Sequence, residues 1–258
     1  MASPVTTESL TLRRFDFSDT SQVAHLLTRS SGRLNALAKG IKRSKRAAIF
    51  DLFSHGRLTF LPRPSGQLQL VTEYDAIATF PAIRASLPRL HAALYFLELA
   101  IEIVPEGEPN AAAFDTLLSG LRGLEAEAPA SAPALVLSFE LEFLSLGGFA
   151  PRAGSCLSCG KDVGRAPEPF RFSPGEGGFL CRDCFAARGP KPALAAPVAR
   201  AALKILESLS RRETRAGERM TAPKLPDGAI PPLRSLMDAH VRATIEKDLK
   251  TARFLPRR

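Results

Sequence analysis

Several residue types are scarce in this chain of 258 residues, and each absence narrows the chemistry open to it. There is no tryptophan, and there are only two tyrosines and four histidines. The histidines, His25, His55, His91 and His240, are scattered, and no HExxH motif brings two of them onto one helix face. The glycine-rich phosphate loops GxxxxGK(S/T) and GxGxxG are also absent. We therefore find no active site in the sequence and predict that the protein is not an enzyme.

Long uninterrupted hydrophobic runs are absent as well. The longest apolar stretch, APALVLSFELEFLSLGGFA, is interrupted by Glu140 and Glu142. The pieces on either side are too short to cross a bilayer, so we expect no membrane span. The first residues, MASPVTTESLTLRR, lack the basic segment and apolar core of a secretory signal. We therefore expect the protein to be cytoplasmic.

Positive charge is in excess, and it is unevenly distributed. The formal net charge is +9. Residues 1–75 carry 11 basic and 6 acidic side chains, residues 76–150 carry 3 and 9, residues 151–184 carry 5 and 4, and residues 185–258 carry 16 and 7. Two basic ends thus flank an acidic middle. Any single charged run is ordinarily a solvated surface, but segregation on this scale favours a polyanionic partner such as nucleic acid.

The first eighty residues have the pattern of short strands separated by turns. Leu10–Arg13 is one candidate strand. QVAHLLT and LNALAKG flank the loop RSSGR, and RLTFLPR and LQLVTEYDAI flank Pro64–Gly66, so each pair predicts a hairpin. A closed or nearly closed antiparallel barrel leaves few unpaired edges among five strands. The five-stranded OB-fold is the common barrel of that size.

Beyond residue 80 the apolar period changes to that of helices. The sequence predicts a helix that begins near Pro88, a second capped by Asn110, and a buried third from Pro133 to Leu146. We expect two more, one starting near Pro197 and carrying Val198, and a last one after Pro231 and Pro232 that extends to Leu249. Residues 211–230, rich in charge, glycine and proline, predict a flexible loop.

The predicted fold class is a multidomain α+β protein. We expect residues 1–80 to form an OB-fold domain suited to binding DNA, residues 81–150 and 185–258 to form an α-helical domain, and residues 151–184 to form an inserted module that binds zinc.

That module contains every cysteine of the chain. Cys156, Cys159, Cys181 and Cys184 form two C-x2-C pairs separated by 21 residues, a spacing typical of a four-thiolate zinc site. FRFS, PGEGG and FLC between the pairs predict a strand, a glycine turn and a strand, as in a zinc ribbon. Two disulfides, a thioredoxin-like redox pair or an iron–sulfur cluster are the alternatives. We predict one structural zinc ion, whose four thiolates leave no open position for catalysis.

The stretch KGIKRSKR is the candidate DNA-binding loop. It carries Lys39, Lys42, Arg43, Lys45 and Arg46 without one acid, on a barrel of a kind that commonly binds oligonucleotides. The preceding turn adds two further candidates, Arg29 and Arg33.

Aromatic residues predict the style of binding. Phe15, Phe17, Phe50, Phe53 and Phe60 occupy core-like positions, and we expect most of them to be buried. Few exposed aromatic rings would then be left on which DNA bases could stack. Binding is expected to depend on phosphate contacts, to ignore base sequence and to weaken steeply with salt.

Several stretches together resemble one protein family. They are LLTRSSGRLNALAKGIKR, TFPAIRASLPRL, VPEGEPN, LSLGGFAP, the two C-x2-C pairs with FSPGEGGFLC, and LKTARFL. In this order and spacing, from about residue 8 to 255, they resemble the RecO family of bacterial recombination-mediator and DNA-repair proteins.

The resemblance implies an OB-fold, a helical domain and a zinc-binding module. It also implies binding of single- and double-stranded DNA, annealing of complementary strands, and loading of RecA together with RecR and the single-strand DNA-binding protein. The cysteines match those of the zinc-bearing members. Some relatives lack them, so the metal is not indispensable to the family's activity.

Further basic residues near the C-terminus, Arg211, Arg212 and Arg215, are candidates for a secondary basic surface or for binding the acidic tail of the single-strand DNA-binding protein. Two other classes of function stay open at this point. One is a zinc-ribbon subunit of a nucleic-acid-processing enzyme, which would need clustered acids, whereas the acids here fall on expected helix exteriors. The other is a transcription adaptor or scaffold that binds no DNA.

Overall fold

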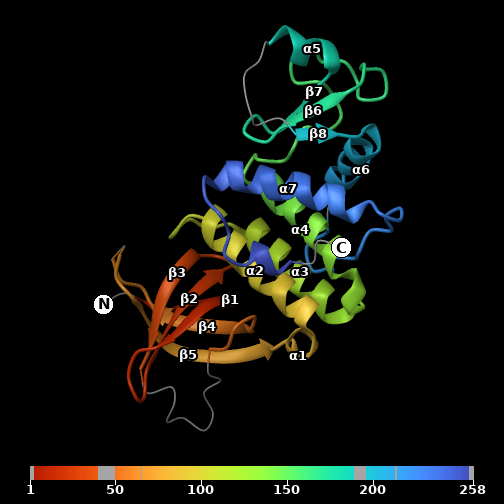
Figure 1. Cartoon of the computed structure of the whole chain (residues 1–258). Coiled ribbons are helices and arrows are strands. Elements are labelled where there is room, and N and C mark those ends of the chain that lie inside the picture. The colour runs from red at the N-terminus through yellow and green to blue at the C-terminus, as the bar shows by residue number, and fades with distance from the viewer. Residues whose placement is uncertain (1–2, 40–49, 65, 189–195, 213, 256–258) are drawn as a thin grey trace.

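The N-terminal part is a closed five-stranded barrel (Figure 1). The computed structural model describes residues 3–39, 50–64, 66–188, 196–212 and 214–255. The barrel strands are β1 Val5–Asp16, β2 Gln22–Thr28, β3 Gly32–Ala38, β4 His55–Leu61 and β5 Gln69–Ala78. Their order around the barrel is β1-β2-β3-β5-β4, and the β3–β5 pair is parallel whereas the others are antiparallel. The predicted barrel is confirmed.

Side-chain alternation gives the barrel two apolar faces. One set of buried residues, including Ala24, Leu26 and Leu34, fills the interior. Leu10, Leu12 and Leu27 belong instead to the cluster that continues into the helices. The barrel therefore shares its outer core with the helical part.

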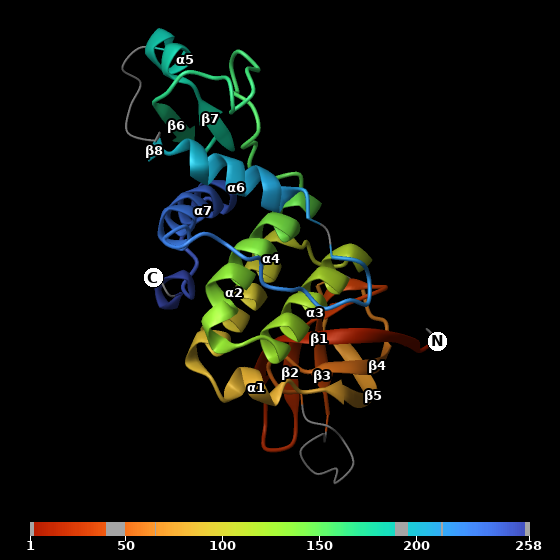
Figure 2. The same cartoon turned by 90° about the vertical axis from the view of Figure 1, so that its right-hand side faces the viewer.

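A helical layer follows the barrel (Figures 1 and 2). Its helices are α1 Pro81–Arg84, α2 Leu87–Ile103, α3 Ala111–Ala126, the 3-10 turn η2 Pro129–Ser131, α4 Ala132–Leu146, α6 Arg200–Ser210, α7 Ile230–Ile245 and the 3-10 turn η3 Ala252–Phe254. Asn110 caps α3 as predicted, because its side chain accepts a hydrogen bond from the Ala113 N–H at 2.9 Å.

Helix α4 is the central helix of this layer. It contacts α2, α3, α6 and α7, and Leu135, Phe139 and Phe143 on it are fully buried. Among the described residues, Pro129–Leu146 is long and apolar enough to cross a membrane by length and composition alone. Its packing among four helices accounts for that apolar character, as expected for a core helix.

The inserted module lies at the far end of the helical layer from the barrel (Figure 1). It contains β6 Phe170–Ser173, β7 Gly178–Leu180 and α5 Arg182–Ala187. The predicted strand, turn and strand are present. A third strand, β8 Ala196–Val198, completes the sheet in the order β7-β6-β8.

Strand β8 corrects the start of one predicted helix. Pro197 and Val198 lie in this strand, paired with β6, and α6 begins only at Arg200. Proline has no backbone N–H to donate. Strand β8 is an edge strand with one neighbour, so it tolerates the missing donor. A proline that suits the first turn of a helix equally suits a sheet edge.

The C-terminal part departs from prediction at two places. Helix α7 begins at Ile230 and ends at Ile245, where Glu246 takes the left-handed conformation with φ of 56°, so Leu249 is buried but lies outside the helix. The segment 211–229 lacks regular structure in its described part, as predicted, yet it packs against α3. Met220 is buried, and its N–H donates to the Ser119 carbonyl at 3.0 Å.

One continuous cluster of buried residues runs through the molecule. It joins the outer face of the barrel, the helices, and Phe170, Phe172 and Phe179 of the inserted module. The division at residues 80, 150 and 184 into three domains therefore stays a prediction.

Acidic side chains also lie inside this core, contrary to the expected helix exteriors. Glu140 on α4 is fully buried and pairs with Arg234 of α7 at 2.5 Å. The Tyr95 hydroxyl donates to the same carboxylate, and Arg234 also contacts Asp238. The helical pattern of the sequence did not reveal the burial of Glu140, because its partner Arg234 is 94 residues away in the sequence.

Candidate metal centre and nucleic-acid interface

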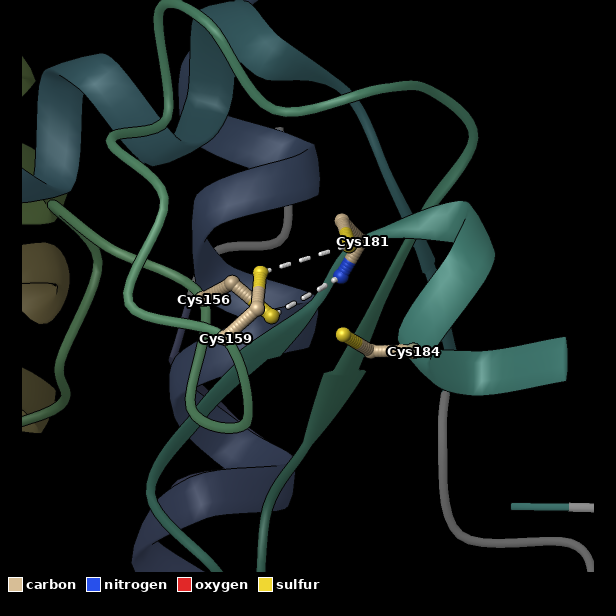
Figure 3. Close-up of side chains that lie close together, drawn as sticks. All are labelled: Cys156, Cys159, Cys181 and Cys184. Carbon is tan, nitrogen blue, oxygen red and sulfur yellow. Dashed lines mark hydrogen bonds between the residues drawn. The ribbon is translucent and has the colours of Figure 1, made fainter. Parts of the chain in front are cut away.

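The four cysteines converge at one point of the inserted module (Figure 3). Their sulfur atoms all lie within 4.8 Å of one another. Cys156 and Cys159 come from one loop, Cys181 precedes α5, and Cys184 lies on α5. Four sulfurs gathered at this spacing from two chain segments can surround a single tetrahedral metal ion.

Backbone hydrogen bonds shape the first cysteine loop. The Cys156 N–H donates to the Lys161 carbonyl at 2.9 Å, and the Gly160 N–H donates to the Cys156 carbonyl at 3.0 Å. Gly160 has a φ of 70°, a conformation that a side chain would strain. The resulting tight turn directs both sulfurs of the first pair toward the second pair.

The protonation chemistry of the sulfurs fits a metal site. Burial acts to raise the pKa of Cys156, but the backbone N–H groups of Cys159, Cys181 and Ser158 outweigh it and lower that pKa to about 6. The pKa of Cys184 is raised to about 12, chiefly because Cys181 and Cys159 hydrogen-bond to the Cys184 thiol. A divalent cation among four sulfurs would displace such shared protons. The donor set therefore fits zinc.

Two side chains of the helical layer hold the module. Arg200 of α6 donates to the Ala166 carbonyl at 2.9 Å, pairs with Glu168 at 2.8 Å and lies over the Phe170 ring. The His240 ring on α7 is buried. Its Nδ1 lies 3.1 Å from the Pro174 carbonyl oxygen, and its Nε2 lies 2.7 Å from that of Phe149.

The predicted DNA-binding loop is described at one residue. Lys39 is exposed and follows the last residue of β3. The other four basic residues of the loop, Lys42, Arg43, Lys45 and Arg46, lie outside the described residues.

The two arginines of the preceding turn face the helical layer. Arg29 pairs with Asp115 of α3 at 2.8 Å and lies over the Phe114 ring, and the Arg33 Nε donates to the Val104 carbonyl at 3.0 Å. These contacts hold the barrel against the helices. A contact of either arginine with DNA stays a prediction.

The C-terminal basic residues are exposed beside α6. Arg211 pairs with Glu207 at 2.6 Å, and Arg212 lines a cavity of about 140 Å³ together with Glu142 and Arg219. Arg215 is exposed on the following segment. Their proposed roles stay predictions.

Two phenylalanines depart from the expected burial. Phe50, Phe53 and Phe60 are buried, but Phe15 is 50% and Phe17 is 66% exposed. Phe15 follows Arg13 at an alternate position of β1, which places these two side chains on the same face of the sheet, and Phe17 lies just beyond the end of the strand. That alternation was the signal in the sequence from which this face could have been found.

Comparison with known proteins covers nearly the whole chain. The model of the family described as "Recombination protein O N terminal" matches residues 1–80, and that described as "Recombination protein O C terminal" matches residues 84–252.

Curated relatives share one name, DNA repair protein RecO. That of Rhodopirellula baltica is 34% identical over 178 residues, which are 68% of this chain and 65% of the relative. That of a Roseiflexus species is 32% identical over 253 residues, 96% of this chain and 84% of the relative. That of Symbiobacterium thermophilum is 29% identical over 96% of this chain and 95% of the relative. With both halves matched in order, the chain belongs to the RecO family of DNA repair proteins.

Proposed function

We propose that this protein is a non-enzymatic mediator of DNA repair and homologous recombination. It binds single- and double-stranded DNA through phosphate contacts, anneals complementary strands and, with RecR, loads RecA onto DNA covered by the single-strand DNA-binding protein. The observation that carries the proposal is the match of both family models to residues 1–80 and 84–252, with a closed barrel in the first part. The protein acts in the cytoplasm and is associated with the nucleoid when it is bound to DNA.

The mechanism follows from charge. Two DNA strands repel each other through their phosphates, and cations on one protein neutralise that repulsion until base pairing takes over. We assign this role first to Lys39 and to Lys42, Arg43, Lys45 and Arg46 that follow it in the sequence. Arg29 and Arg33 stay secondary candidates. Arg211, Arg212 and Arg215 are the candidates for a second basic surface or for the acidic tail of the single-strand DNA-binding protein.

The metal has a structural role in this proposal. Cys156, Cys159, Cys181 and Cys184 would hold one zinc ion per chain, with every coordination position filled by a thiolate. The ion would fix the two cysteine loops to each other. DNA contacts belong to the barrel, about a hundred residues earlier in the chain.

Charge reversal tests the proposal. We expect the variant with glutamate at 42, 43, 45 and 46 to bind DNA more weakly and to anneal strands more slowly. The slope of log K against log salt should become shallower by up to about 3 for a single strand, since each lost phosphate contact contributes about 0.7. Fluorescence anisotropy across a salt series measures this slope. Annealing is followed with and without the single-strand DNA-binding protein.

A control variant carries the same change in net charge at Lys161, Arg165, Arg182 and Lys204, which are exposed on the module and α6. It should bind DNA nearly as the wild type does. Unchanged affinity in the loop variant would refute the assignment to this loop. DNA cleavage by the pure protein with divalent metal would contradict the non-enzymatic proposal, and failure of the wild type to bind DNA at low salt would favour a scaffold.

A further inference from the structure

The outer face of the barrel carries a row of apolar side chains across four strands. Strand register pairs Phe15 of β1 with Val23 of β2, Val23 with Leu37 of β3, and Leu37 with Leu70 of β5. Directly paired residues point to the same side of a sheet, so these four side chains form one line. Phe15 is half exposed and the other three are partly exposed. The row is therefore accessible from solvent, unlike the faces covered by the helices.

An aromatic pair stands at the β1 end of this row. The Phe15 and His25 rings lie with centroids 5.4 Å apart and an interplanar angle of 59°. Phe17 follows just beyond the end of β1 and is 66% exposed. The turn that follows is ordered by Ser18, whose hydroxyl accepts hydrogen bonds from the N–H groups of Thr20 and Ser21 at 3.3 and 3.1 Å. The rings thus stand on a strand and an ordered turn.

Charge around the row is complementary to a polyanion. Arg13 precedes Phe15 on the same side of β1 and is paired in register with His25. Burial, followed by the charges of Arg13 and Arg33, lowers the pKa of His25, so its ring is neutral at physiological pH. Lys39 lies one residue beyond Ala38, which pairs with Gln22 at the start of β2. A cation therefore stands on each side of the apolar row.

The acid nearest in sequence faces elsewhere. Asp16 alternates with Phe15 and accepts a hydrogen bond from the buried Gln22 side chain at 3.3 Å. It points to the other side of the sheet. On the side that carries the rings, one acid lies beyond His25: Glu106 accepts a hydrogen bond at 3.0 Å from the side chain of Asn35, the β3 residue paired with His25.

We propose that this row, with Phe15 and His25 as its aromatic end, is a stacking platform for the bases of single-stranded DNA. The inference rests on the proposed function and goes beyond it, because phosphate contacts alone do not distinguish a single strand from a duplex. Unpaired bases can lie flat on exposed rings, whereas stacked bases inside a duplex cannot. Apolar partly exposed side chains accept base faces of any sequence. Arg13 and Lys39 flank the row at a position to meet the phosphates on either side.

Substitution of Phe15 separates stacking from charge. Phe15→Leu keeps an apolar side chain at a half-exposed position but removes the ring. We expect its affinity for an oligo-dT to fall about 5- to 100-fold, as for loss of one stacked base. Its affinity for a blunt duplex should change less than twofold, and the salt slope for oligo-dT should stay that of the wild type, because no phosphate contact is lost. Anisotropy with both labelled DNAs gives these values.

A tryptophan reporter gives an independent measurement. The wild-type chain has no tryptophan, so Phe15→Trp carries a single one. Oligo-dT should quench its fluorescence, and its affinity should match that of the wild type. The matched control is Phe254→Trp, because Phe254 is 46% exposed and also stacks on a histidine, His91, but lies in the helical layer. Its emission should be unaffected by oligo-dT.

Each outcome decides between distinct conclusions. If Phe15→Leu binds oligo-dT as tightly as the wild type does, the stacking platform is refuted, and a protein partner becomes the alternative ligand of this face. Equal losses for oligo-dT and duplex would also overturn it, since stacking favours the single strand. A wild type that binds neither DNA would overturn the proposed function, and the platform with it.

Discussion

Single residues with long-range partners decide how the helices of this protein pack. Arg234 is buried on α7 and bridges Glu140 of α4 and Asp238 of its own helix, while Tyr95 of α2 completes the network. Burial disfavours the charge of Arg234, but Glu140 and its neighbours raise the pKa of Arg234, so the guanidinium stays protonated. A buried charge of this kind depends on its partner for stability.

Removal of one partner of this pair should therefore cost more than removal of both. We expect Arg234→Met to lower the free energy of unfolding by about 3 to 5 kcal/mol, because Glu140 is left buried without its cation. The double variant with Glu140→Leu should recover most of that loss. Urea unfolding of the four proteins measures the coupling. Additive losses would show that the two side chains do not act as a pair.

For single residues, the sequence predicted the chemical role of a side chain better than it predicted whether that side chain is buried. The cysteine cluster and the Asn110 cap are recognisable from residue type and spacing. Glu140 and Phe15 are not, because their exposure depends on residues far away in the chain. Glu140 is paired with Arg234 of α7, whereas Phe15 stays half exposed on β1.

At the scale of elements, neighbouring sheets and helices decide what local pattern leaves ambiguous. All five barrel strands were recognisable from alternation and turns. The short strand β8 was not, because three residues with a proline carry little strand signal and its pairing with β6 is set by the module. The end of α7 at Ile245 was missed because the apolar spacing of the sequence continues to the buried Leu249.

The inserted module should depend on metal more than any other element. We expect chelation to accelerate amide hydrogen exchange in residues 152–184, since the sulfur cluster joins the two cysteine loops of this small module. Strands β1 to β5 should keep their protection, and annealing should persist. Mass spectrometry of exchange before and after chelation, with zinc added back, measures this. Equal loss of protection in the barrel would contradict a local role for the metal.

At the scale of the whole molecule, one carboxylate ties the end of the chain to the helical core. Glu98 of α2 accepts hydrogen bonds from the Lys250 N–H at 3.0 Å and from the Thr251 N–H at 2.8 Å, and the Thr251 hydroxyl donates to it as well. Burial acts to raise the pKa of Glu98, but these bonds together lower it below the usual 4.5. The charged form therefore holds the C-terminal segment in place.

The stability that Glu98 provides should depend on pH. A carboxylate whose pKa is lowered by folding contributes above its unfolded pKa, near 4.5, and loses that contribution as pH falls through the folded value. We expect Glu98→Gln to lower the free energy of unfolding by about 1 to 3 kcal/mol at pH 7. The difference should shrink below pH 4.5. Urea unfolding across this range measures it, with exposed Glu73→Gln as the control. A pH-independent difference would contradict the mechanism.

The shared core has a consequence for how this protein can be divided. Leu10, Leu12 and Leu27 of the barrel are buried in the same cluster as the helices. Gly32, the first residue of β3, approaches the Glu108 backbone so closely that an added Cβ would lie 2.2 Å from the Glu108 carbonyl oxygen. Residues 1–80 cut free would carry an uncovered apolar patch into water, and such patches promote self-association. We therefore expect the barrel alone, cut or fused at residue 80, to aggregate and not to behave as an independent domain.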